Sequence, residues 1–188
     1  MKNFYEKTVE SNKIFEGRVV KLRVDRVILP NGKEATREVV EHPGAVAVVA
    51  LTDKDEIVMV RQFRKPVEET TLEIPAGKLE GGEDPHSCAR RELEEETGLK
   101  PNRIKLLMEF YTTPGFSDEK MYLFLAEDLE EVPPHRDDDE LVEVEKLPLG
   151  KAVNWVMQGK INDAKTIIGI LAVDCLRSRK GGRGGGAG

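Results

Sequence analysis

Acidic side chains crowd into one short stretch near the middle of the chain, GKLEGGEDPHSCARRELEEETGL (77–99). Asp84 followed by Pro85 predicts the start of a helix, because an Asp side chain caps the first turn and proline is tolerated at the first helical position. Gly98 predicts the end of this helix. Carboxylates three and four residues apart on a helix repel each other, so the cluster costs stability unless a cation relieves it.

Three of these carboxylates share one side of the predicted helix. A helix turns by about 100° per residue, so Glu96 lies about 40° from Glu92, and Glu95 lies about 60° to its other side. Ala89 and Leu93 mark a neighbouring apolar stripe that we expect to face the core. A patch of carboxylate oxygens suits hard divalent cations such as Mg²⁺ or Mn²⁺. Helix geometry alone is equally compatible with a solvated face of ordinary Arg–Glu pairs.

The spacing across this stretch separates the two interpretations, because every specified position of the Nudix box is matched. The matching residues are Gly77, Glu83, Arg91, Glu92, Leu93, Glu95, Glu96, Gly98 and Leu99. The chain therefore resembles Nudix hydrolases, which cleave a nucleoside diphosphate linked to another group. The resemblance covers residues 44–176 and implies an α+β fold, a Nudix α/β/α sandwich with a mixed sheet.

The resemblance assigns metal ligands by position. Glu92 and Glu96 are expected to be the main ligands, with Glu95 binding the metal directly or through water. The carbonyl oxygen of Ala76 is expected to be a further ligand. The implied cofactor is Mg²⁺, with Mn²⁺ as a substitute. These ions neutralise a pyrophosphate and deprotonate water, which is otherwise a poor nucleophile.

Two further residues of the box are expected to support the metal site. Arg91 is expected to orient the carboxylates through charge-assisted hydrogen bonds, and so to take part in catalysis together with Glu95. Glu83 is expected to act from outside the metal's coordination shell or through a metal-bound water.

Segments that flank the box resemble the ADP-ribose pyrophosphatase branch of the family. They are EHPGAVAVVA, VRQFRKP, TLEIPAGKLE and TTPGFSDE, and Pro114, sixteen residues after Gly98, is the most diagnostic position. The implied reaction converts ADP-ribose and water to AMP and ribose 5-phosphate. GDP-mannose hydrolases are close relatives, so GDP-mannose and dinucleoside polyphosphates remain alternative substrates.

Four residues outside the box are expected to contact substrate by the same resemblance, and Pro114 is one of them. Arg64 of RQFR is expected on the substrate phosphates, and Arg37 in the N-terminal hairpin is expected to do similar work. Glu73 of LEIPAG is expected to contact substrate or to adjust the charge of the metal site. In this branch the hairpin crosses to the other subunit, which implies a homodimer with shared sites. The alternative for each arginine is a surface ion pair.

The general base is expected on the loop PPHRDDDELVEVEKLP. In this branch it is a glutamate outside the box, and Glu140 aligns best. Asp139 and Glu143 are the alternatives, and an acidic run of this kind is also typical of a solvated loop. We find no Ser–His or Cys–His constellation, which favours direct attack by water.

The elements that must position these residues follow from the sequence patterns. Residues 17–29 and 34–42 alternate around the turn Pro30–Lys33, which predicts an antiparallel hairpin. Further strands are expected at 44–51, 56–64, 71–77, 104–112 and 120–128, and helices at 85–97, at 149–159 and, capped by Asn162, through 178. The predicted organisation is an N-terminal β extension (1–43), a Nudix domain (44–177) and a disordered glycine-rich tail (178–188).

Composition limits the classes of partner. The chain has 188 residues, 39% of them hydrophobic, and a net charge of −6 with acidic and basic residues interspersed. We therefore expect neither nucleic-acid nor membrane binding. With two cysteines, the default is a soluble cytoplasmic protein. Rival functions are a non-catalytic ADP-ribose sensor and an isoprenoid diphosphate isomerase, which would need a reactive cysteine.

Overall fold

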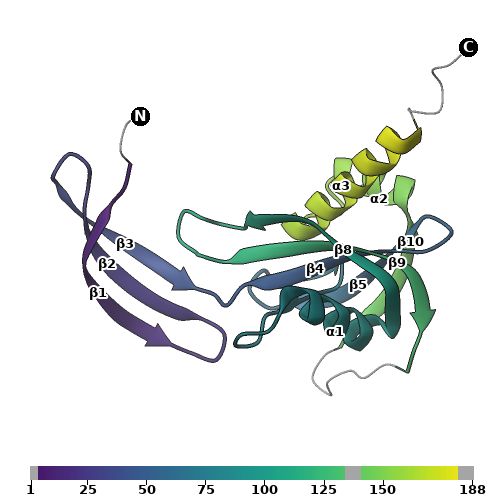
Figure 1. Cartoon of the computed structure of the whole chain (residues 1–188), viewed down its shortest axis with the longest axis horizontal. Coiled ribbons are helices and arrows are strands. Elements are labelled where there is room, and N and C mark those ends of the chain that lie inside the picture. The colour runs from purple at the N-terminus through teal and green to yellow at the C-terminus, as the bar shows by residue number, and fades with distance from the viewer. Residues whose placement is uncertain (1–3, 134–140, 182–188) are drawn as a thin grey trace, which may run out of the picture. The chain divides into compact units, whose positions relative to one another are not determined.

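The computed structural model describes residues 4–133 and 141–181, which fall into two compact units (Figure 1). The larger unit comprises Ala45–Glu109 and Met121–Gly188. The smaller unit comprises Met1–Gly44 and Phe110–Lys120. The tip of the β8–β9 hairpin thus belongs with the N-terminal segment.

A mixed sheet of seven strands forms the middle of the larger unit. The strands are β4 (Ala45–Leu51), β5 (Glu56–Arg64), β6 (Glu69–Glu73), β7 (Ala76–Lys78), β8 (Leu99–Tyr111), β9 (Lys120–Glu131) and β10 (Glu143–Pro148). Their order is β10-β5-β4-β9-β8, with β6 paired to β5 and β7 paired to β4. β4 runs parallel to β9 and antiparallel to β5 and β7, which makes the sheet mixed, as predicted.

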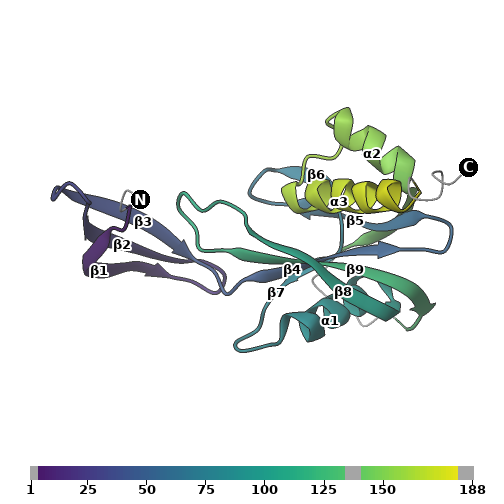
Figure 2. The same cartoon turned by 45° about the horizontal axis from the view of Figure 1, so that its top comes forward.

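Three helices cover the two faces of this sheet. Helix α1 (Pro85–Thr97) lies on one face, and α2 (Leu149–Met157) and α3 (Ala164–Gly181) lie on the other (Figure 2). The predicted α/β/α sandwich is therefore confirmed. Helix α3 continues past residue 177, where the sequence analysis ended the domain, and residues 182–188 of the predicted tail lie outside the described residues.

The core is built around β4, whose seven residues are all buried. A continuous apolar run is expected for a strand with helices on both faces. Val46 and Val48 belong to one buried cluster with Ala89 and Leu93 of α1, as the helical periodicity predicted. On the other face α3 approaches so closely that a Cβ at Gly169 would lie 2.7 Å from Val49.

Local signals set the helix ends. Asp84 caps α1 by accepting a hydrogen bond from the backbone N–H of Ser87 at 3.0 Å, and Gly98 ends it in the left-handed region at φ 67°, so both predictions are confirmed. The predicted cap of α3 is wrong by one residue. Asp163, not Asn162, accepts the Thr166 backbone N–H at 3.0 Å. Asp163 stands three residues before Thr166, which is the spacing that an N-cap requires.

The smaller unit contains a three-stranded antiparallel sheet, β1 (Lys7–Glu16), β2 (Lys21–Ile28) and β3 (Glu34–Glu41). The predicted hairpin is β2 and β3. Strand β1 was missed because every one of its residues is exposed, so it carries no alternating pattern. The hairpin tip joins β3 by two backbone hydrogen bonds, Val40 N–H to the Phe116 carbonyl (2.8 Å) and Asp118 N–H to the Val40 carbonyl (3.3 Å).

None of the helices in the described part of the chain combines the length and the low polarity that a membrane crossing demands.

Candidate active site

The candidate site lies where β4 and β5 separate. These strands pair only through Ala50–Val58 and Leu51–Ile57. Beyond that point β7 takes the place beside β4, and β6 the place beside β5. The segment Glu73–Ala76, which we call the β6–β7 connection, therefore lies in the opening of the sheet.

Three contacts hold the β6–β7 connection in place. The Ile74 N–H donates to the Thr166 hydroxyl at 2.9 Å, and the Pro75 carbonyl accepts from the Val48 N–H at 2.8 Å. The Ala76 N–H donates to the Glu96 carboxylate at 3.1 Å. Glu96 is only 5% exposed, so the box helix and the backbone of a predicted ligand are joined inside the protein.

Arg91 links three carboxylates of the box, a group that we call the Arg91 cluster. Its Nε and Nη2 each donate to Glu83 at 3.1 Å in a two-point contact. Its Nη1 donates to Glu95 at 2.9 Å and lies 2.9 Å from Glu92. One guanidinium group thus contacts three carboxylates through charge-assisted interactions.

Charge within the Arg91 cluster shifts two ionisable groups strongly. The hydrogen bond from Arg91 is the main cause that lowers the pKa of Glu83 to about 2. The same contact, with the charge of Glu92 and a hydrogen bond to Glu95, raises the pKa of Arg91. Both groups are therefore charged throughout the physiological range.

Gly77 makes room for the Glu92 carboxylate. A Cβ at Gly77 would lie 1.8 Å from Cδ of Glu92 and 2.0 Å from Oε1. No atom can approach so closely, so any side chain at this position would displace the carboxylate. The first glycine of the box is thus explained by its contact with a predicted metal ligand.

The donor chemistry at this site fits a hard divalent cation. Within residues 4–133 and 141–181, no group of three or more His, Cys, Asp or Glu side chains already stands together as a metal site. Yet the Arg91 cluster places a positive charge between Glu92 and Glu95. Glu96 lies beside Ala76, whose carbonyl is a further oxygen donor. Carboxylate and carbonyl oxygens are the ligands that Mg²⁺ and Mn²⁺ prefer.

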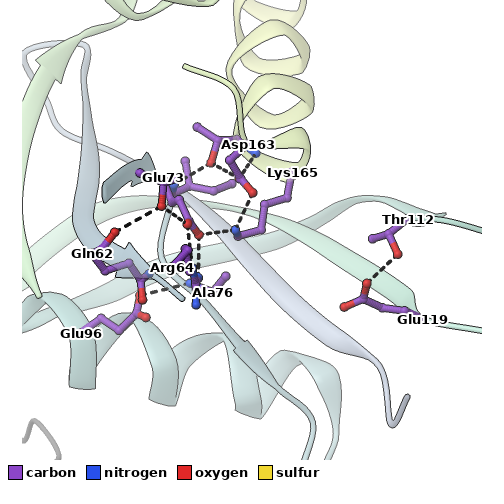
Figure 3. A network of polar contacts seen from close by, with 12 residues as sticks. Gln62, Arg64, Glu73, Ala76, Glu96, Thr112, Glu119, Asp163 and Lys165 are labelled. Carbon is purple, nitrogen blue, oxygen red and sulfur yellow. Dashed lines mark hydrogen bonds and ion pairs between the residues drawn. The ribbon is translucent and has the colours of Figure 1, made fainter. Parts of the chain in front are cut away.

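A second polar group, the Arg64 cluster, lies at the ends of β5 and β6 (Figure 3). Arg64 donates from Nε and Nη2 to the two oxygens of Glu73 at 2.8 and 2.7 Å. Lys165 of α3 donates to the same Glu73 carboxylate, and the Thr71 hydroxyl donates to it at 2.5 Å. Glu73 is 1% exposed, whereas the side chain of Arg64 is 41% exposed.

Donors outweigh burial in setting the charge of Glu73. Burial, the largest single influence, would raise its pKa. The pKa of Glu73 is nevertheless lowered to about 2 by its donors: the hydrogen bond from Arg64, the charge and hydrogen bond of Lys165, and the hydrogen bond from Thr71. The contact with Glu73 in turn raises the pKa of Arg64, and the charges of Glu96 and Asp163 add to this. Arg64 therefore interacts electrostatically with both Glu73 and the box helix.

Cys88 lies on the buried side of α1, as predicted. It is fully buried, and burial, followed by its interaction with Glu83, raises the pKa of its thiol to about 12. Nucleophilic chemistry needs the thiolate. This cysteine is therefore unsuited to the isomerase alternative.

The remaining predicted residues belong to the smaller unit, to β10 or to the part of the chain outside the described residues. Arg37 belongs to the smaller unit and donates to Glu6 at 2.8 and 2.7 Å, and Pro114 is exposed at the hairpin tip in the same unit. Glu140 and Asp139 lie outside the described residues. Glu143, the other alternative for the base, is exposed at the start of β10, where it lies opposite Arg61 in the strand register.

An open hollow lies beside α1, next to the point where the chain leads into the loop of the predicted base. It is lined by Arg91, Glu94, Glu95, Val132 and Pro133. Pro133 is the last described residue before that segment. The chain therefore leaves the described structure next to two residues of the box.

Sequence reasoning missed the part that α3 plays at this site. Lys165, Asp163 and Thr166 contact Glu73 or the β6–β7 connection, directly or through one another. The only local signal was an Asp three residues before a Thr, which indicates a helix start. It does not reveal which strand that helix start will meet.

Comparisons with known proteins cover nearly the whole chain. The NUDIX domain model matches residues 41–167, and the model of the nucleoside diphosphate sugar hydrolase N-terminal domain matches residues 6–40. The chain is 51% identical over 172 residues to the ADP-ribose pyrophosphatase of Bacillus subtilis (strain 168), covering 90% of this chain and 93% of the relative. It is 50% identical over 171 residues to the methanol dehydrogenase activator of Bacillus methanolicus, covering 90% and 92%.

A solved structure shares the fold. The crystal structure of an ADP compounds hydrolase superposes with a TM-score of 0.85, covering 96% of this chain and 99% of that chain. At 21% identity this likeness concerns the fold alone.

Proposed function

The chain belongs to the Nudix hydrolase family, and from this premise we propose that it hydrolyses the pyrophosphate bond of ADP-ribose to AMP and ribose 5-phosphate. The observation that carries the proposal is the Glu92 carboxylate packed over Gly77 beside Glu95 and Arg91. Close identity to an ADP-ribose pyrophosphatase over nine tenths of the chain supports the substrate.

Divalent metal is typical of the family, and we propose Mg²⁺, with Mn²⁺ as a substitute. Glu92, Glu96 and Glu95 would hold it, with the carbonyl of Ala76. When bound, such an ion neutralises diphosphate charge and lowers the pKa of a bound water. Arg91 keeps its carboxylates oriented through the two-point contact with Glu83.

Arg64 is the proposed diphosphate contact of the larger unit. Among the described residues, Glu73 accepts hydrogen bonds from Nε and Nη2 of Arg64. Nη1 of Arg64 is the donor that we assign to an oxygen of the substrate. Guanidinium groups suit this role because they stay charged and bond phosphate oxygens in fixed directions. Arg37 and Pro114 of the smaller unit are proposed as further substrate contacts.

Glu140 is the proposed general base, which takes the proton of the attacking water. Glu73 does not fit this role, because a carboxyl group with a pKa of about 2 is a weak base at neutral pH. Asp139 and Glu143 remain the alternatives.

We propose a cytoplasmic homodimer whose sites are shared between subunits. A small sheet needs a covered face to be stable, yet β1 is exposed at every residue. Exposed apolar side chains in this segment include Phe4, Tyr5, Ile14 and Phe15. Light scattering on the full chain and on a variant that lacks residues 1–43 tests this. A monomeric full chain would refute the dimer.

Product analysis tests the substrate. ADP-ribose, GDP-mannose and a dinucleoside polyphosphate are supplied with Mg²⁺, and kcat/KM is measured for each. We expect ADP-ribose to give the highest value, with AMP and ribose 5-phosphate as products. A higher kcat/KM for either competitor would replace ADP-ribose as the substrate.

A second candidate function is activation of a dehydrogenase. The methanol dehydrogenase activator of Bacillus methanolicus is as similar to this chain as the pyrophosphatase is. Adding the purified chain to a bacillar methanol dehydrogenase and following its rate tests this role. A Glu92→Gln variant shows whether any activation needs hydrolysis.

A further inference from the structure

Lys165 lies outside the Nudix box, yet its ammonium group contacts the interior of the candidate site. Its side chain is 11% exposed. Lysine is almost never so buried unless it is paired, because burial disfavours its charge. Its partners are Glu73 and, at 3.0 Å, Asp163.

Glu73 is fully occupied by donors from the protein. A carboxylate has about four acceptor positions. Arg64 donates twice to Glu73, and Lys165 and Thr71 donate once each. The oxygen that Lys165 contacts, Oε2, is also the one that holds Nη2 of Arg64. Without Lys165 the Glu73 carboxylate would lose a fixed point and could turn away from Arg64.

The N-terminus of α3 fixes the position of Lys165. Asp163 uses Oδ2 to cap the helix through the backbone N–H (3.0 Å) and hydroxyl (2.6 Å) of Thr166, which leaves Oδ1 for the ammonium of Lys165. The same Thr166 hydroxyl accepts the N–H of Ile74. The first turn of α3 thus contacts both Glu73, through Lys165, and the neighbouring backbone of Ile74, through Thr166.

We propose that Lys165 is a positioning residue for the diphosphate of the substrate: it orients Glu73, and Glu73 holds Arg64 in the direction of the phosphates. The inference rests on the proposed function, in which Arg64 binds the diphosphate. Lys165 itself does not touch the substrate.

Kinetics of Lys165→Met test the inference, with Lys160→Met as the matched control. Lys160 is exposed, and its ammonium group lies over the Trp155 ring. We expect KM for ADP-ribose to rise about tenfold or more in Lys165→Met, with kcat changed less, because a charge-assisted contact that orients the binding group is lost. Lys165→Arg keeps a charged donor and should restore most of the affinity. Equal KM values for Lys165→Met and Lys160→Met would overturn the proposal.

A double variant separates orientation from net charge. Asp163→Asn keeps a good N-cap residue but removes one negative charge beside Lys165. Lys165→Met with Asp163→Asn therefore restores the local charge balance without restoring the contact to Glu73. We expect its KM to stay high. Recovery of the wild-type KM would mean that Lys165 acts only through charge, which contradicts positioning.

A direct readout of Arg64 makes the test independent of turnover. The Nε–H of Arg64 is protected by Glu73 and should give a slowly exchanging signal in ¹⁵N NMR spectra of the wild type. The signal should be lost in Lys165→Met and retained in Lys160→Met. If the Arg64 signal is retained in both variants, the inference is refuted. The spectrum of Lys165→Arg serves as a folded reference where Lys165→Met is too unstable for kinetics.

Failure of the inference and failure of the proposed function give different results. Titration of ADP-ribose in EDTA measures binding without hydrolysis. If the wild type binds ADP-ribose but does not hydrolyse it with Mg²⁺, the proposed function fails while the effect of Lys165 on binding is still measured. If the wild type hydrolyses ADP-ribose and Lys165→Met leaves KM and binding unchanged, only the inference fails.

Discussion

The Arg91 cluster and the Arg64 cluster are both built from ion pairs, but in different proportions. In the first, one guanidinium serves three carboxylates, those of Glu83, Glu92 and Glu95, which leaves an excess of negative charge. In the second, the carboxylates of Glu73 and Asp163 balance the two cations, Arg64 and Lys165, so this cluster has no excess of negative charge. The negative surplus of the first suits a metal ion, whereas in the second the partly exposed guanidinium of Arg64 suits a phosphate.

The β6–β7 connection links the Arg64 cluster to the helix that carries most of the Arg91 cluster. Glu73 ends β6 in the Arg64 cluster, and three residues later the Ala76 N–H donates to Glu96 of the box helix. A substrate diphosphate with bound metal has both signs of charge, so we expect its site to need the carboxylates of the box and the guanidinium of Arg64 at a fixed separation. The short β6–β7 connection and its hydrogen bond to Glu96 help to fix that separation.

Removing one charge from the negative surplus should have the largest effect. Glu92→Gln keeps the shape of the side chain and weakens the metal site. We expect kcat/KM for ADP-ribose to fall by about 10³-fold, because metal ions contribute several kcal/mol to such reactions. The melting temperature in EDTA should be unchanged or slightly higher, since like-charge repulsion is relieved.

Glu94→Gln, on the same helix at a position that the box does not specify, is the control for Glu92→Gln. Both variants are assayed with Mg²⁺ and melted in EDTA. If Glu94→Gln lost turnover while Glu92→Gln kept it, the cation would have to bind another face of α1.

The proton acceptor should belong to neither cluster, and Glu140→Gln tests this. We expect kcat to fall by about 10²-fold, the lower range for loss of a general base, with little change in metal affinity. Steady-state kinetics and calorimetric Mg²⁺ titration measure the two quantities. Asp139→Asn and Glu143→Gln are the matched controls, and a larger loss of kcat in either would transfer the role.

The sequence predicted the Arg91 cluster far better than the Arg64 cluster. Every residue of the first lies within one loop and helix, whose start and end are encoded locally by Asp84, Pro85 and Gly98. In the second, Glu73 and Lys165 are 92 residues apart. A lysine after a helix cap has the same pattern as any exposed helix start, so nothing local indicated that it would be buried.

Strand β1 and the start of α3 were misassigned because the sequence around each lacks the deciding signal. Strand β1 was missed because its exposed residues show no alternation. The cap of α3 was placed on Asn162 because Asn and Asp cap helices equally well. The choice of Asp163 depends on its distance to Thr166, and that in turn depends on where α3 meets Ile74. Tertiary contacts therefore determine which residue caps α3.

A glycine substitution can disturb the geometry of the Arg91 cluster without removing a charge. In Gly77→Ala the new Cβ would lie 1.8 Å from Cδ of Glu92, so the carboxylate must move. We expect turnover to fall by about 10²-fold, a typical cost of displacing a catalytic group by about 1 Å. The free energy of unfolding should change by only about 1 kcal/mol, because the clash involves the end of a flexible side chain.

Gly81→Ala is the control for Gly77→Ala, since a Cβ there meets no atom within 4 Å. Activity and urea unfolding are compared for both. Full activity in Gly77→Ala would show that the position of Glu92 is not critical for metal binding.

Acid should weaken the fold through the carboxylates that the two clusters hold ionised, and Glu73 measures the contribution of the Arg64 cluster. Its pKa of about 2 in the folded chain lies below the value of 4.5 expected for an unperturbed Glu. The unfolded chain therefore binds a proton first as pH falls. The stability that Glu73 contributes is fully present above about pH 4.5 and is lost between about 4.5 and 2, on the order of 3 kcal/mol.

Urea unfolding from pH 2.5 to 6 should give a flatter pH dependence for Glu73→Gln than for the wild type. Glu68→Gln, at an exposed turn, should keep the wild-type slope. An unchanged slope in Glu73→Gln would mean that the Arg64 cluster does not hold its carboxylate ionised, and the contrast between the two clusters would lose its electrostatic basis.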